Sequence, residues 1–227
     1  MYQLAHRGLS DLYPENTMSA FKAAIEEPFD GIETDIQMTK DGELILLHDY
    51  MINRTSNGRG YVRDYTYEEL LHFNFGVNFN RLDKIPTLKE LLVLIKESGK
   101  IANLEIKADV YPETVRKTVE LVKTFDMDDQ IYYSSTDLSK MLEVKQMLPD
   151  AYCAIITDHN YTICKQDVYH NPIEGIHSRY NYLSVKELNQ YKKDNIKVGA
   201  WTITTEEQFN YFKQNDILFA FTNHYYK

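Results

Sequence analysis

The chain is sparing in cysteine, proline and glycine. Of its 227 residues, only 2 are cysteine, 6 are proline and 9 are glycine. The two cysteines, Cys153 and Cys164, form no C-x-x-C pattern, which argues against a disulfide framework and favours two free thiols. No proline-, glycine- or serine-rich linker marks a boundary, so we expect a single domain over residues 1–227.

Positive charge and long apolar runs are also scarce. The formal net charge is −9, and no basic stripe of the kind carried by nucleic-acid binders is present. An acidic chain repels anions in general, so any phosphate-binding pocket in it must supply its own cations. No run reaches about 18 consecutive apolar residues, and the first residues lack the basic and apolar regions of a secretory signal. We therefore expect a cytoplasmic protein with no membrane span and no nucleic-acid partner, and its oligomeric state is left open.

Strand-like and helix-like segments alternate along the chain, which indicates an α/β protein. Strands are expected at residues 2–5, 31–38, 101–106, 130–134, 152–156, 174–177, 197–201 and 217–222. Helices are expected at residues 17–26, 87–98, 112–125, 138–147, 185–194 and 206–214, whereas residues 157–172 fit neither pattern. Strands separated by helices are typical of parallel βαβ units. Eight such units in 227 residues fit a compact (β/α)8 TIM barrel, whose usual lower limit is about 200 residues. The alternative is an open doubly wound sheet, but no glycine-rich nucleotide loop follows the first strand.

Residues 50–85 interrupt this alternation. They lack strand character, and their one helical piece, at residues 66–72, begins with a capping box formed by Thr66 and Glu69. Active-site groups of such barrels lie at the carboxyl ends of the strands, and this segment follows one of those ends. We therefore expect a small insertion after the second strand and its hairpin, at residues 50–85, that caps the active-site face.

Acidic, basic and histidine side chains gather on three of the expected strands, at the end of the first and third and within the second. They are His6-Arg7, Glu33-x-Asp35 and Glu105-x-Lys107. Side chains two apart on a strand point the same way, so the members of the second pair share a face, as do those of the third. Each pair alone has a plainer explanation, such as an exposed cross-strand ion pair. Their joint placement at one rim of the barrel indicates a site.

A fourth group, His48, returns to this rim through a hairpin. Asp-Gly between two apolar-alternating runs is a strong hairpin signal. A two-residue loop at Asp41-Gly42 places residue 48 opposite Asp35, and a loop at Lys40-Asp41 places it opposite Glu33. Either register predicts that His48 shares the face of both carboxylates.

The three converging carboxylates, Glu33, Asp35 and Glu105, have no cysteine beside them. Such a set of oxygen donors suits one hard divalent cation, Mg²⁺ or Ca²⁺, with Mn²⁺ as a further candidate.

The remaining groups suit acid–base work on a phosphodiester. His6 and His48 have the side chain whose ordinary pKa lies nearest neutrality, and Arg7 and Lys107 can donate to non-bridging phosphate oxygens. One histidine would deprotonate the nucleophile and the other would protonate the departing alkoxide. The set predicts metal-assisted cleavage of a phosphodiester.

Several short ordered blocks run along nearly the full chain. They are Ala5-His6-Arg7-Gly8, Tyr13-Pro14-Glu15-Asn16-Thr17, Ser19-Ala20-Phe21, Ile32-Glu33-Thr34-Asp35, Thr39-Lys40-Asp41-Gly42, His48-Asp49, Arg54-Thr55-Ser56-Asn57-Gly58-Arg59-Gly60, Ile85-Pro86-Thr87-Leu88, Leu104-Glu105-Ile106-Lys107 and Trp201-Thr202. Together, in this order, the blocks resemble those of the glycerophosphodiester phosphodiesterases.

The resemblance implies a (β/α)8 barrel with an insertion after the His48-Asp49 block. It also implies a divalent metal on the three carboxylates, acid–base roles for the two histidines, phosphate contacts from Arg7 and Lys107, and an aromatic wall at Trp201. The implied reaction is hydrolysis of a small-molecule glycerophosphodiester, such as glycerophosphocholine or glycerophosphoethanolamine, to glycerol 3-phosphate and an alcohol.

Two other functions stay open on this resemblance. One is removal of the head group from lysophospholipids, and the other is a catalytically silent barrel that binds a glycerophosphodiester. The sequence departs from the family pattern at Thr136, at Thr204 and in residues 217–223. These positions concern the pocket wall and therefore the preferred alcohol.

Overall fold

The computed structural model describes residues 1–108, 111–158 and 161–227. Within these residues, eight parallel strands close into a barrel, and a ninth short strand, β3 (Leu44–Leu46), lies antiparallel on β2. The barrel strands, in chain order, are β1 (Tyr2–His6), β2 (Gly31–Met38), β4 (Ile101–Ile106), β5 (Ile131–Ser135), β6 (Cys153–Thr157), β7 (Gly175–Arg179), β8 (Lys197–Ile203) and β9 (Phe219–Thr222).

Barrel closure depends on β1, which pairs with a strand on each side. Gln3 lies opposite Ala220 of β9, and Ala5 lies opposite Ile32 of β2, both in parallel register. A sheet closed in this way has no free edge among its eight strands. The predicted (β/α)8 barrel is therefore confirmed, and the doubly wound alternative is wrong.

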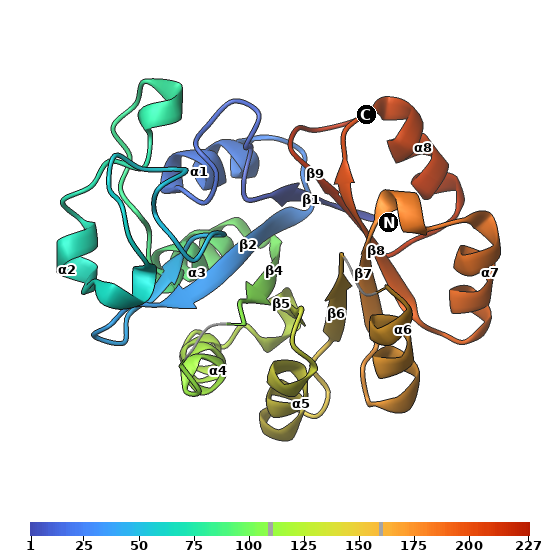
Figure 1. Cartoon of the computed structure of the whole chain (residues 1–227). Helices are drawn as coiled ribbons and strands as arrows, with labels where there is room; N and C mark the ends of the chain where they lie inside the picture. Colours follow the sequence, from blue (N-terminus) through green and yellow to red (C-terminus); the bar gives the residue numbers. More distant parts are fainter. Residues whose placement is uncertain (109–110, 159–160) are drawn as a thin grey trace.

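Helices surround the barrel, one between most successive strands (Figure 1). They are α1 (Met18–Glu26), α3 (Leu88–Ser98), α4 (Thr114–Thr124), α5 (Leu138–Met147), α6 (Tyr161–His170), α7 (Val185–Lys193) and α8 (Glu206–Gln214). The predicted strand and helix ends agree with these bounds to within two residues. Helix α6 lies in the stretch to which the sequence pattern assigned no element. Of its described side chains only Val168 is buried, so the apolar stripe that normally indicates a helix is weak.

The β2–β3 hairpin differs from both predicted registers. Met38 pairs with Leu44, and the Thr39 N–H donates to the Glu43 carbonyl at 2.9 Å, so the loop has three residues instead of two. The third of them is Gly42, with φ +86°, and a left-handed third residue is typical of three-residue hairpin loops. Continued along β3, this register would place residue 48 opposite Thr34, on the wrong face. The prediction that strand register brings His48 to the carboxylates is therefore wrong.

Residues 50–85 fold beside the hairpin, as 3-10 helix η1 (Val62–Asp64), helix α2 (Tyr67–Leu70) and 3-10 helix η2 (Val77–Phe79). The predicted capping box of Thr66 and Glu69 is present. A small apolar cluster joins the segment to the hairpin. Its buried members are Ile45, Leu47, Ile52, Val62, Leu70, Phe75 and Ile85.

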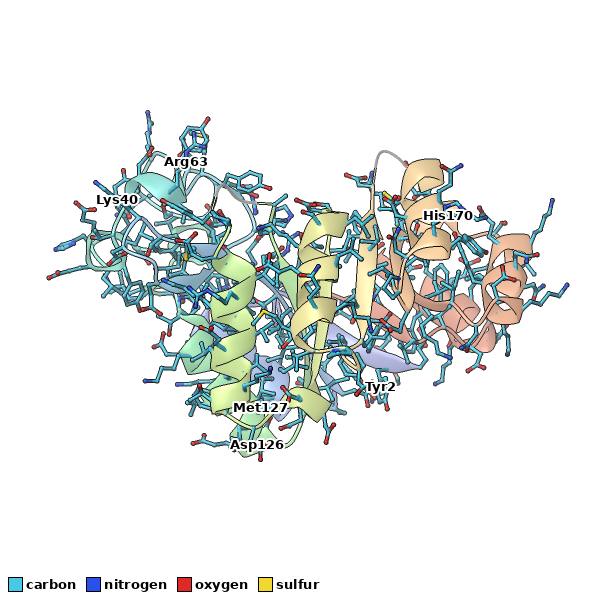
Figure 2. The ribbon with its side chains drawn as sticks, turned by 90° about the horizontal axis from the view of Figure 1, so that it is seen from below. Tyr2, Lys40, Arg63, Asp126, Met127 and His170 are labelled. Carbon is cyan, nitrogen blue, oxygen red and sulfur yellow. The ribbon has the colours of Figure 1, made fainter. Side chains whose placement is uncertain are left out.

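Two labelled residues show where this segment lies. Figure 2 shows Arg63, of the segment, at the same end of the molecule as Lys40, at the hairpin tip, and opposite Asp126 and Met127, which precede β5.

None of the helices in the described part of the chain is both long and apolar enough to cross a membrane.

Candidate active site

A cavity of about 250 Å³ opens at the carboxyl ends of the barrel strands. Seven of the eight predicted site residues line it, and the eighth, Asp35, is fully buried. The seven are His6, Arg7, Glu33, His48, Glu105, Lys107 and Trp201. The structure thus brings together all of the groups that the sequence singled out.

The three carboxylates form one compact cluster. One oxygen from each of Glu33, Asp35 and Glu105 lies within 4.8 Å of the others, because Asp35 of β2 is directly opposite Glu105 of β4. Burial, and then repulsion by Asp35 and Glu105, raises the pKa of Glu33 well above its usual value. Burial and Asp35 likewise raise the pKa of Glu105. All three donors are carboxylates that repel one another, with Glu33 and Asp35 buried and Glu105 partly exposed, so the set fits a hard divalent cation.

Two cations contact this cluster. The Lys107 Nζ lies 2.6 Å from Glu105 Oε1 and 3.4 Å from Asp35 Oδ1, and the Arg7 Nε lies 3.4 Å from Asp35 Oδ2. Burial opposes ionisation of Asp35, but Arg7 and Lys107 outweigh it and hold the pKa of that carboxyl well below its usual range. Two positive charges cannot neutralise three ionised carboxylates, so a bound divalent cation would be attracted to the cluster.

His6 is fixed in one tautomer by the far end of the chain. Its Nδ1 lies 2.9 Å from Oδ1 of Asn223, and an amide oxygen can only accept, so Nδ1 carries the proton. The lone pair is then on Nε2, which lies 3.9 Å from Glu33 Oε2. Burial, followed by the neighbouring Arg7, lowers the pKa of His6 to about 4. The imidazole is therefore neutral at physiological pH and able to accept a proton at Nε2.

His48 reaches the cavity after the chain has left β3. The buried side chain of Gln37 donates to the carbonyls of Leu47 at 2.6 Å and of Asp49 at 2.7 Å, which holds the backbone on both sides of His48. The His48 Nδ1 lies 2.7 Å from Asp49 Oδ1. An ionised carboxylate can only accept a hydrogen bond, so Nδ1 again carries a proton. Nε2 is the nitrogen available for proton transfer.

Sequence reasoning missed several residues that support the site. Four of them lie in conspicuous segments of the sequence but have no role predicted from it: Glu15, Asp49, Arg54 and Asn223. Gln37 had a usable signal, because it follows Asp35 by two residues on β2 and must therefore point the same way.

Another part of the cavity wall comes from later strands of the barrel and includes aromatic side chains. Trp201 of β8 donates from its indole Nε1 to the carbonyl of His177 at 3.1 Å, and Phe221 and Thr136 also line the cavity. Two of the departures from the family pattern, at Thr136 and within residues 217–223, therefore do reach the pocket. Thr204 does not line it.

A model of the glycerophosphoryl diester phosphodiesterase family matches residues 6–226. The chain belongs to this family. It is 33% identical over 215 residues to a glycerophosphodiester phosphodiesterase of Caldanaerobacter subterraneus, a match that covers 90% of this chain and 86% of that protein. It is also 28% identical to glycerophosphodiester phosphodiesterase 1 of the mouse, over 93% of this chain and 74% of that one.

Solved structures of related proteins have the same fold. A phosphodiesterase of Oleispira antarctica, solved in complex with its product sn-glycerol-3-phosphate, superposes with a TM-score of 0.92 at 24% identity, over 99% of this chain and 93% of that one. A glycerophosphodiester phosphodiesterase of Thermotoga maritima superposes with a TM-score of 0.80 at 26% identity, over 99% and 95% of the two chains.

Proposed function

We propose that this member of the family hydrolyses small glycerophosphodiesters to sn-glycerol 3-phosphate and an alcohol, with a divalent metal and two histidines. The observation that carries the proposal is that two histidines, each with its Nδ1 held by an acceptor, line one cavity with a three-carboxylate cluster and two cations. The net charge of −9 favours an aqueous substrate over an anionic membrane surface, in keeping with the predicted cytoplasmic location.

Glu33, Asp35 and Glu105 would hold the metal, as Mg²⁺, Ca²⁺ or Mn²⁺. When bound, a divalent ion supplies positive charge against the phosphoryl oxygens as negative charge develops on them. Arg7 and Lys107 line the same cavity and donate to the non-bridging oxygens, which orients the phosphodiester and adds to the same stabilisation.

We assign the two proton transfers to the Nε2 atoms, since the Nδ1 of each histidine is held by an acceptor. The Nε2 of His6 accepts the proton of the attacking hydroxyl. Attack by water gives glycerol 3-phosphate directly, whereas attack by the glycerol 2-hydroxyl gives a cyclic phosphate that a water molecule then opens to glycerol 3-phosphate. The Nε2 of His48, in its protonated form, donates a proton to the alkoxide as the phosphorus–oxygen bond breaks. The Asp49 carboxylate stabilises the positive imidazole before that transfer, since it accepts from Nδ1.

Release of glycerol 3-phosphate tests the proposal directly. Glycerophosphocholine is incubated with enzyme stripped by EDTA, and Mg²⁺, Ca²⁺ or Mn²⁺ is then restored. We expect release only after metal is returned. No release with any metal, on glycerophosphoethanolamine and glycerophosphoglycerol as well, would contradict the proposal. Choline release from lysophosphatidylcholine would then point to the lysophospholipid alternative, and binding without turnover would point to a silent barrel.

A further inference from the structure

Arg54, in the segment 50–85, makes paired hydrogen bonds to two carboxylates at once. Its Nε donates to Asp49 Oδ2 at 2.6 Å, and its Nη2 to Asp49 Oδ1 at 3.0 Å. Its Nη1 and Nη2 donate to the two oxygens of Glu15 at 2.7 and 2.8 Å. Only the planar guanidinium, with its fork of donors, can serve two carboxylates in this way.

Both of these carboxylates hold a group of the active site. Asp49 Oδ1 lies 2.7 Å from the Nδ1 of His48, and Glu15 Oε1 accepts from the Nη1 of Arg7 at 2.9 Å. A continuous chain of ionic hydrogen bonds therefore runs from His48 through Asp49, Arg54 and Glu15 to Arg7. Asp49 and Glu15 lie 34 positions apart in the chain, and Arg54 is the group that joins them.

Arg54 itself stands outside the cavity. It does not line the cavity, and its side chain is 46% exposed. Its backbone is held in place, since the Asn78 side chain donates to the Arg54 carbonyl at 2.9 Å and the neighbouring Ile52 is fully buried in the cluster of the segment. The residue is therefore placed to act on the reaction only through Asp49 and Glu15.

We propose that Arg54 is a positioning residue that orients His48 and Arg7 together, so that the segment 50–85 supplies part of the catalytic apparatus. The inference rests on the proposed function, in which His48 and Arg7 act on the phosphodiester. Because its pairs are bidentate and part of a network, losing Arg54 also costs some stability, so rates are compared on variants that circular dichroism shows to be folded.

The test compares R54Q and R54K with R116Q, which removes an exposed arginine from its Glu120 ion pair on α4. Initial rates are measured on glycerophosphocholine with saturating Mg²⁺. We expect R54Q to lower kcat about 10- to 100-fold, the usual loss when a residue that orients a catalytic group is removed. We expect R54K to recover only part of this loss because lysine cannot bond both carboxylates. R116Q should keep the wild-type kcat.

A double-mutant cycle separates positioning from a general effect on folding. If Arg54 acts on His48 and Arg7 through Asp49 and Glu15, R54Q added to the double variant D49N/E15Q should cost at most about twofold more than D49N/E15Q alone. The Nδ1–H proton resonance of His48 should also move in R54Q, with circular dichroism unchanged. Additive losses, or a kcat of R54Q within twofold of wild type, would overturn the inference. If H48Q retains full activity, the proposed function fails instead, so the two failures are distinguishable.

Discussion

The Nδ1 of His6 lies 2.9 Å from Oδ1 of Asn223, a residue 217 positions later in the chain. His6 ends the first barrel strand, and Asn223 directly follows the last. The contact therefore crosses the seam where β1 and β9 close the barrel. It holds the proton of His6 on Nδ1 and leaves the lone pair on Nε2, the atom proposed as the base.

Asn223→Asp should shift the pH dependence of the reaction in a direction set by the charge of the new side chain. The pKa of His6 is about 4, and the base is active when neutral, so wild-type kcat/KM should fall only as the pH drops through about 4. A carboxylate at position 223 stabilises the imidazolium and raises that pKa. The acid limb of the pH–rate profile should then move to higher pH, whereas Asn195→Asp, on an exposed turn, should leave it in place. An unmoved limb in Asn223→Asp would show that His6 is not the base.

The leaving group should distinguish the two histidines. H6Q and H48Q are each expected to lower kcat on glycerophosphocholine by about 10²- to 10⁴-fold. With a glycerophosphodiester of p-nitrophenol, the departing group needs no proton. The loss in H48Q should then shrink to about tenfold or less, while the loss in H6Q persists. The opposite pattern would assign the acid role to His6 and the base role to His48.

Glu33→Gln should separate metal binding from stability. It removes one of three repelling buried carboxylates, so the metal-free variant should unfold at a higher temperature than the metal-free wild type. Metal at about 100 times its Kd should stabilise the wild type by about 2.7 kcal/mol and the variant far less. Differential scanning calorimetry with and without Mg²⁺ measures both effects, and Glu97→Gln, exposed on α3, should behave as wild type. An undiminished metal shift in Glu33→Gln would exclude this carboxylate as a ligand.

Acid should destabilise the fold through His177. Burial lowers its pKa to about 3, whereas the unfolded chain takes up the proton below about 6.5. Because the unfolded state then binds more protons, the free energy of unfolding falls as pH drops from about 6.5 towards 3, by up to about 5 kcal/mol. Urea titrations at pH 7, 5 and 4 should give a shallower fall in H177Q than in wild type. A control, H170Q, changes an exposed histidine of α6 and should keep the wild-type slope.

Local patterns in the sequence predicted most of the architecture. The strands are visible as short apolar or alternating runs and most helices as a period of about 3.6 residues, and a βαβ unit has one preferred way to fold. The hairpin at residues 38–44 is the exception. Its loop length depends on hydrogen bonds made by Thr39, which donates to Asp41 at 2.5 Å and accepts from the Glu43 N–H at 2.9 Å. The Asp-Gly dipeptide carries no information on such contacts, and both predicted registers were wrong by one residue.

The sequence by itself determined the kind of site, because the residue types and their spacing on strands define both the chemistry and the direction of each side chain. Only the tertiary structure decided which nitrogen of each histidine is free, since Asn223 and Asp49 hold the other. It also decided that Arg54 joins Asp49 to Glu15. Apart from the His48–Asp49 contact between chain neighbours, these contacts join residues that no local period relates. They exist only once the barrel has closed and the segment 50–85 has packed against its hairpin.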